Sequence, residues 1–415
     1  MTGRAAGSLL TALEAFRNVL TGQPVLGIGL LLVGGWFLGR AMSKLGLPAM
    51  AGFIGAGVIL GPMVLGVVHS DLHDELGVIT EVAVALIAVV IGSEIAPLKI
   101  RAMDRAMAVM TSVRLLATLL LVSVALRLTG LVSWPAALLL GAIAAATAPA
   151  TTVALVRDLK ARGSFIERLY STVALEDAGC VLLFSVTAVF APGFLLRGSS
   201  GIPEMLLSGL LRASASIATG VGFGFVISRA TRRSRRENDI YIIGLALVCL
   251  MTALANSYGL SPLLAGLASG ALLANRRRGS RRVTNALEGM APPLYAAFFA
   301  IAGTELSFRG TAWWATTAIL TTAVLSRAAG KYLGAGLGAA ASGEHPLVRR
   351  YMGAALLPQG GVAVGLALFL QSSPEFVSLP EVTSMVVSVT LLSVMVNELV
   401  GAPVSRWAIS RGSTL

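Results

Sequence analysis

Long apolar runs recur along almost the whole chain, from about residue 24 to residue 405. A helix of about 20 apolar residues is long enough to cross the hydrocarbon core of a bilayer. Because lipid offers no hydrogen bonds, backbone polar groups in the bilayer must be satisfied within the protein, as they are in helices. The sequence therefore predicts an all-α polytopic membrane protein.

We count about thirteen transmembrane helices. Their predicted bounds are 23–41, 47–68, 76–97, 106–127, 134–156, 166–190, 203–228, 239–257, 261–275, 286–304, 312–341, 348–371 and 379–405. Pro292 and Pro293 interrupt the tenth. The preceding residues, 1–22, have the spacing of a short helix that lies at the membrane interface.

The charge distribution is typical of a membrane protein. Only 13% of the residues are charged, against roughly 25% in soluble domains. The formal net charge is +12, but the basic clusters "RATRRSRR" and "RRRGSRR" lie between apolar segments without interleaved aromatic residues. Such clusters indicate cytoplasmic loops, not nucleic-acid binding. If the C-terminus is placed inside, most Lys and Arg residues of the loops fall inside. The outside segments then hold only Arg4, Arg17, Arg127, Arg197 and Arg309, so we expect the N-terminus outside.

Four polar irregularities fall at the centres of their segments. Glu176 and Asp177 lie in the middle of the sixth, and Arg327 in the middle of the eleventh. "ATAPATT" (146–152) and "LLPQGGVAVG" (356–365) occupy the centres of the fifth and twelfth. A charge at the bilayer centre costs roughly 2.5–3.5 kcal/mol on insertion scales. These shared depths predict a functional site at the membrane midplane.

Pro149 and Pro358 predict that the fifth and twelfth segments are broken helices, because each proline removes a backbone donor and clashes with the preceding turn. Non-helical backbone at this depth is tolerated where it is buried in protein or lines a cavity. Broken helices at matching positions of two halves indicate a transporter's binding site. With 203–228 as a linker helix, the halves form an inverted repeat. The alternative is a pair of ordinary proline kinks.

Several stretches of the chain resemble the bacterial monovalent cation/proton antiporters of the NapA and Kef type, which are Na⁺(K⁺)/H⁺ exchangers. The stretches are "AGFIGAGVILGP" (51–62), "TAPATT" (147–152), "ALEDAG" (174–179), "GLSPLLAGLASGALLAN" (259–275), "FFAIAGTELSF" (298–308), "SRAAGKYLGAGLGA" (326–339) and "LLPQGGVAVGLAL" (356–368). The resemblance implies a NapA-like antiporter fold, a bacterial inner-membrane location, a homodimer and no cofactor.

The resemblance also implies a division of the chain. Residues 23–97 and 239–304 would form a dimer domain, and 98–192 and 312–405 a core domain that moves as an elevator. The ion site would lie on Asp177. Its neighbour Glu176 would pair with a base of the eleventh segment, which alignment on the following glycine places at Arg327 and not at Lys331.

The sequence departs from the family pattern in three places. Ala148 stands where the family's Thr-Asp-Pro motif has Asp. The acidic pair is Glu176–Asp177, where Asp-Asp or Asn-Asp is commoner. Arg114 lies in the middle of the fourth segment. Because Arg114 and Arg327 balance the two acids, an alternative interpretation is a buried network that only orders the core.

We expect Asp177 to hold either a proton or a small cation, but not both. Hard cations prefer oxygen ligands, which Asp177, the backbone around Ala148, and the hydroxyls of Thr147 or Thr151 can supply. Gln359 would support the crossing from the other broken helix. Lys331, about a turn from Arg327, would reach the cytoplasmic funnel. Glu94, Asn256, Asn397 and Glu398 fall towards the ends of their predicted segments.

The sequence thus predicts a secondary transporter, not an enzyme, that exchanges a monovalent cation for protons. Na⁺ is slightly preferred over K⁺. Proton counting favours electroneutral exchange, because Arg327 cannot release a proton and Glu176 is held by a permanent cation. The alternatives are a transporter of the same fold for an anion or organic solute, and a membrane sensor or scaffold that does not transport.

Overall fold

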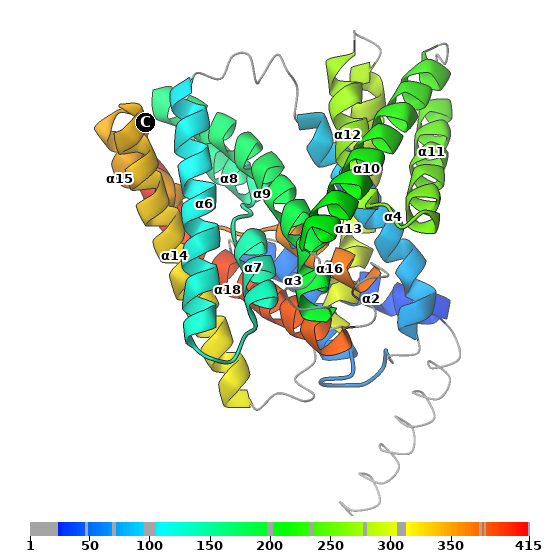
Figure 1. The fold of residues 1–415 in the computed structure, drawn as a ribbon, viewed down its shortest axis with the longest axis horizontal. Coiled ribbons are helices and arrows are strands. Elements are labelled where there is room, and N and C mark those ends of the chain that lie inside the picture. Colours follow the sequence, from blue (N-terminus) through cyan, green and yellow to red (C-terminus); the bar gives the residue numbers. More distant parts are fainter. Residues whose placement is uncertain are drawn as a thin grey trace, which may run out of the picture. The chain divides into compact units, whose positions relative to one another are not determined.

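A computed structural model describes residues 24–45, 49–68, 72–94, 105–196, 202–232, 236–276, 280–304, 313–372, 376 and 379–413. The predicted interfacial segment, residues 1–22, lies outside these ranges. All the elements of the described chain are α-helices (Figure 1). The helices are α2 Pro24–Lys44, α3 Ala49–Leu60, α4 Leu72–Glu94, α6 Arg105–Leu128, α7 Trp134–Ala144, α8 Pro149–Asp158, α9 Ser164–Leu196, α10 Ile202–Thr231, α11 Glu237–Ser257, α12 Pro262–Asn275, α13 Ser280–Thr304, α14 Trp313–Ser342, α15 Pro346–Ala355, α16 Gly361–Ser372 and α18 Pro380–Gly412.

Each predicted transmembrane segment coincides with a helix or a pair of helices. Six described helices are long and apolar enough to cross a membrane, or seven if the proline-interrupted α13 counts as one span. α3, α7 and α12 are shorter apolar helices, and α14, which carries Arg327 and Lys331, is not among the six. The chain is therefore an all-helical membrane-type protein, and the count of thirteen spans stays a prediction.

The two predicted breaks are present. In the first broken helix, α7 ends at Ala144 and α8 begins at Pro149. In the second, α15 ends at Ala355 and α16 begins at Gly361. Pro149 occupies the first helical position of α8, where its missing N–H costs no hydrogen bond. The two extended segments touch, because the N–H of Gly360 donates to the carbonyl of Thr147 at 3.3 Å.

The chain forms two compact units. Unit 1 comprises Met1–Glu81 and Pro292–Ser307, and unit 2 comprises Val82–Ala291 and Phe308–Leu415. In unit 1, a side chain at Gly57 would collide with the carbonyl of Ala300, so this glycine permits the close backbone approach that is common between membrane helices. Both broken helices and the predicted site lie in unit 2. The division into dimer and core domains stays a prediction.

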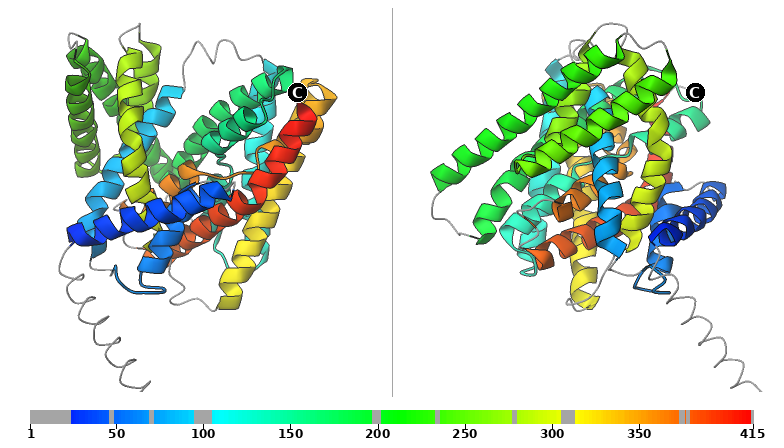
Figure 2. Two further views of the ribbon diagram at one scale, coloured as in Figure 1. Left: turned by 180° about the vertical axis from the view of Figure 1, so that it is seen from behind. Right: turned by 90° about the vertical axis from the view of Figure 1, so that its right-hand side faces the viewer.

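Within unit 2, α6 and α14 run side by side (Figure 1). Gly330, Gly334 and Gly338, one turn apart on α14, face Thr118, Arg114 and Met110 of α6. Such small residues let two helix backbones approach closely in a membrane. This contact brings Arg114 next to the basic residues of α14. Figure 2 shows α18 (red) alongside α14 and α15.

We expect Gly334→Ala to destabilise the protein, because the added methyl group would lie 2.8 Å from the Arg114 Cα and 2.9 Å from the Ala117 Cβ. Overpacking of this kind typically lowers the free energy of unfolding by about 1–3 kcal/mol. The measurement is thermal unfolding in detergent. Gly336→Ala is the matched control, since the nearest atom to its new methyl group, the Arg349 carbonyl oxygen, is 3.9 Å away. Equal melting temperatures for the two variants would contradict the packing argument.

Candidate functional site

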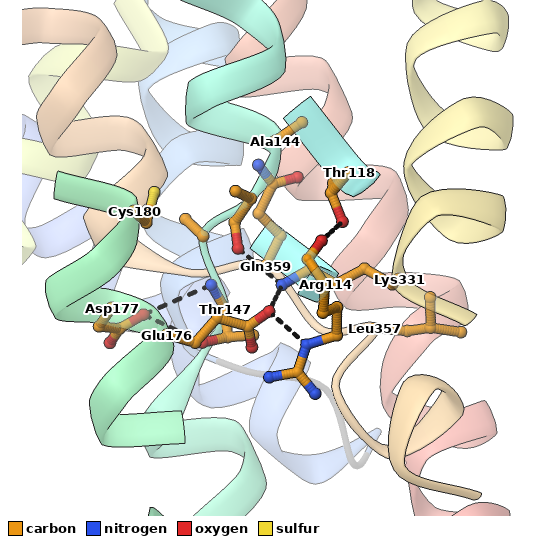
Figure 3. A network of polar contacts seen from close by, with 12 residues as sticks. Arg114, Thr118, Ala144, Thr147, Glu176, Asp177, Cys180, Lys331, Leu357 and Gln359 are labelled. Carbon is orange, nitrogen blue, oxygen red and sulfur yellow. Dashed lines mark hydrogen bonds and ion pairs between the residues drawn. The ribbon is translucent and has the colours of Figure 1, made fainter. Parts of the chain in front are cut away.

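Two basic side chains hold Glu176 of α9. Lys331 Nζ of α14 donates to Glu176 Oε1 at 2.6 Å, and Arg114 Nε of α6 donates to the same oxygen at 2.8 Å (Figure 3). All three side chains are fully buried. Glu176 Oε2 and both terminal nitrogens of Arg114 have no hydrogen-bond partner within the described chain. The site therefore contains a tightly held acid and a guanidinium with spare donors.

The prediction that Arg327 pairs with Glu176 is wrong. Arg327 donates from Nε to the Ala144 carbonyl at 2.9 Å, from Nη2 to the Ala146 carbonyl at 2.9 Å and from Nη1 to the Leu357 carbonyl at 2.6 Å. Its planar guanidinium group thus donates to carbonyls of both breaks. A guanidinium is suited to this because its N–H groups point at several acceptors at fixed angles. A positive charge is also favourable at the carbonyl end of a helix.

Lys331 takes the role that was predicted for Arg327. It follows Arg327 by four residues and therefore lies on the same face of α14, one turn further along. Besides Glu176, its ammonium group donates to the Ala145 carbonyl at 2.6 Å. The carbonyls of Ala144, Ala145 and Ala146, which the break in the first helix leaves without intrahelical partners, are thus all bound by the two bases of α14.

Asp177 faces the first break. Its Oδ1 accepts from the Thr147 hydroxyl at 3.0 Å and lies 3.4 Å from the Thr147 backbone nitrogen (Figure 3). The Asp177 side chain is buried, with 2% of its surface exposed. The structure therefore brings Asp177 and Thr147 together, next to the buried Ala148, whose carbonyl accepts from the Thr152 N–H.

Gln359 lies where the two breaks meet. Its amide nitrogen donates to the Ile143 carbonyl at 3.3 Å, and its carbonyl oxygen accepts from Ser393 Oγ at 3.2 Å and Asn397 Nδ2 at 3.0 Å. Pro358 lies beside it, and its carbonyl is 3.5 Å from Arg327 Nη2. One amide thus connects the first broken helix with α18.

Thr151 has a partner other than Asp177. Its hydroxyl lies 3.3 and 3.2 Å from the two carboxylate oxygens of Glu398 on α18. The neighbouring Asn397 accepts from Arg327 Nη1 at 3.2 Å. Sequence reasoning placed Asn397 and Glu398 near a helix end, but α18 continues to Gly412, so both lie near its middle. The signal was two adjacent polar residues in the apolar run "SVMVNELVG" (393–401).

These features define a class of protein. Apolar helices that can cross a bilayer, and two broken helices that meet beside a buried carboxylate, are typical of secondary membrane transporters. A family model described as "Sodium/hydrogen exchanger, transmembrane" matches residues 28–407. The chain therefore belongs to the sodium/hydrogen exchanger family, and the resemblance to monovalent cation/proton antiporters is confirmed.

The fold is similar to that of a solved antiporter. The sodium proton antiporter MjNhaP1 from Methanocaldococcus jannaschii matches with a TM-score of 0.73 and 18% sequence identity, over 94% of this chain and 97% of that chain. Family and fold together support cation/proton antiport across a membrane, which is transport and not an enzyme reaction.

Proposed function

We propose that this protein exchanges a monovalent cation, Na⁺ in preference to K⁺, for protons, and that both compete for Asp177. The observation that carries the proposal is the contact between the buried Asp177 carboxylate and the Thr147 hydroxyl at the break. A hydroxyl can either donate to the carboxylate or turn a lone pair to a cation. The sodium/hydrogen exchanger family supports Na⁺ as the cation.

The remaining ligands would be oxygens of the first break. The carbonyls of Ala146, Thr147 and Ala148 each accept one hydrogen bond, from Arg327, the Gly360 N–H and the Thr152 N–H respectively. A carbonyl oxygen has two lone pairs, so each can also ligate a cation. Hard monovalent cations prefer such oxygen donors. Thr151 would contribute only after its hydroxyl turned away from Glu398.

An elevator motion of a homodimer's core domains is part of the proposal. Arg327, Lys331 and Gln359 tie both broken helices to α14 and α18, while Glu176 joins α9 to α6 and α14. Because these links are buried and many, the site would change its exposure more easily as one body than by pulling the two breaks apart. We place the protein in a bacterial inner membrane, as the family resemblance implies. The loop charges favour an orientation with the N-terminus outside.

Transport in proteoliposomes under a pH gradient tests the function. We expect Na⁺ added on the side of the membrane opposite to the proton excess to discharge the pH gradient. K⁺ should discharge it more slowly, and chloride or organic anions should have no effect. A transporter of the same fold for an anion is the second candidate, because both terminal nitrogens of the buried Arg114 lack partners within the described chain. Gradient discharge that requires an anion and not Na⁺ would support it instead.

We expect the exchange to be electroneutral. Arg114 and Arg327 cannot release a proton and Glu176 stays paired, so in this proposal Asp177 is the group that alternates between ions. The site then has the same formal charge with Na⁺ bound as with a proton bound. The measurement is Na⁺-driven proton flux with the membrane potential set by a K⁺ ionophore. A rate or end-point that changes with voltage would show that a second group exchanges protons.

A further inference from the structure

Glu398 is a buried carboxylate that the exchange at Asp177 does not use. Its side chain is 1% exposed, and its hydrogen-bond partner is the Thr151 hydroxyl. Among the described residues, no basic side chain approaches it within the 4.0 Å of an ion pair. A buried charge without a close partner is costly, so its retention indicates a role.

The buried charges suggest what that role is. The charged side chains that are buried in the described chain are three bases and three acids: Arg114, Arg327, Lys331, Glu176, Asp177 and Glu398. Glu176 and Asp177 leave one of the three bases unbalanced. Glu398 in its ionised form therefore brings the formal charge of the buried site to zero when Asp177 is also ionised. Without it, an arriving cation would enter a site that carries a net positive charge.

The position of Glu398 adds a second reason. α8 begins with Ala148 as its N-cap, which has no side-chain acceptor for the first backbone N–H groups. Helices prefer Ser, Thr, Asp or Asn at this position, and a negative charge near it is favourable. Thr151 is in the first turn of α8, so its hydrogen bond brings the Glu398 carboxylate to this end of the helix.

We propose that Glu398 sets the cation affinity of the Asp177 site. It balances the third buried base, and through Thr151 it supplies the negative charge that Ala148 does not provide at the start of α8. Glu398 is a positioning residue in this account, because it acts through the charge of the site and not by direct exchange. The proposal rests on cation exchange at Asp177.

Glu398→Gln tests the proposal, because glutamine keeps the shape and an oxygen for Thr151 but removes the charge. Loss of one unit charge at short range in a site of low dielectric should raise the apparent KM for Na⁺ about tenfold. The maximal rate should change much less. Glu381→Gln is the matched control, since Glu381 is exposed in the first turn of the same helix, and its KM should equal that of the parent.

A relocated carboxylate separates charge from packing. Ala148→Asp in the Glu398→Gln background restores the charge count at the same helix end, and we expect it to return the KM most of the way to the parent value. If Glu398→Gln does not fold, Ala148→Asp is measured alone, and its added carboxylate at the same helix end should lower the KM for Na⁺ below the parent value; a parent-like KM would contradict the proposal.

Two results would overturn the proposal. One is a parent-like KM in Glu398→Gln, and the other is a raised KM that Ala148→Asp does not lower. Failure of the proposed function would look different, because the unmodified protein itself would then show no cation-dependent proton flux.

Discussion

Asp177→Asn is expected to reduce cation-dependent proton flux in proteoliposomes to the background of empty vesicles. Asparagine keeps an oxygen that can accept from Thr147, so the local contact at the first break survives. It cannot carry a proton at accessible pH, and it lacks the negative charge that holds Na⁺ in a buried site. The loss should therefore be a loss of transport and not of fold.

Flux is measured with a pH-sensitive dye inside the vesicles, and folding by size-exclusion chromatography and thermal unfolding. Asp158→Asn is the matched control, because Asp158 is exposed at the far end of α8 and should transport like the parent. If Asp177→Asn kept full flux while folded, Asp177 would not be the exchange residue.

The second large effect concerns Glu176. Glu176→Gln leaves Lys331 and Arg114 buried without their carboxylate partner. Removing one member of a buried ion pair typically lowers the free energy of unfolding by about 3–5 kcal/mol. We therefore expect a sharp fall in the melting temperature of this variant, measured in detergent.

Double variants test whether Lys331 or Arg327 of α14 pairs with Glu176. Lys331→Gln in the Glu176→Gln background should recover part of the lost stability, because it removes the orphaned ammonium group. Arg327→Gln in the same background should add its own loss, since Arg327 binds backbone carbonyls instead. Equal recovery of stability by Lys331→Gln and Arg327→Gln would show that Glu176 interacts with Lys331 and Arg327 alike.

The helices and their breaks were predictable because lipid imposes simple rules. Apolar length gave helix positions to within several residues, and Pro149 marked the first break because proline fits the start of a helix but not its interior. Asp177 and Thr147 both lie at the centres of their predicted segments, which predicted that they could meet. Residues at one level of a helix bundle can touch when their helices are neighbours, and here they do. These features depend on local sequence and on the membrane.

The choice between side-chain partners was not predictable. Arg327 and Lys331 lie on one face of α14, four residues apart, and both have the charge to hold Glu176. Which of them does so depends on the distance to α9 and on the carbonyls of α7, which sequence spacing does not contain. Glu398 was missed because the predicted segment stopped at residue 405, whereas the helix continues past Arg411.

The hydrogen bonds of Arg327 have a consequence for biogenesis. Arg327 binds the Ala146 carbonyl from 181 residues further along the chain. At about 5–20 residues per second, the ribosome needs roughly 10–40 s to make that stretch. During this interval the first broken helix has no access to either base of α14 and must find other donors for its carbonyls, from water, the translocon or a chaperone. The hydrogen bonds of the first broken helix are therefore completed only after α14 has been made.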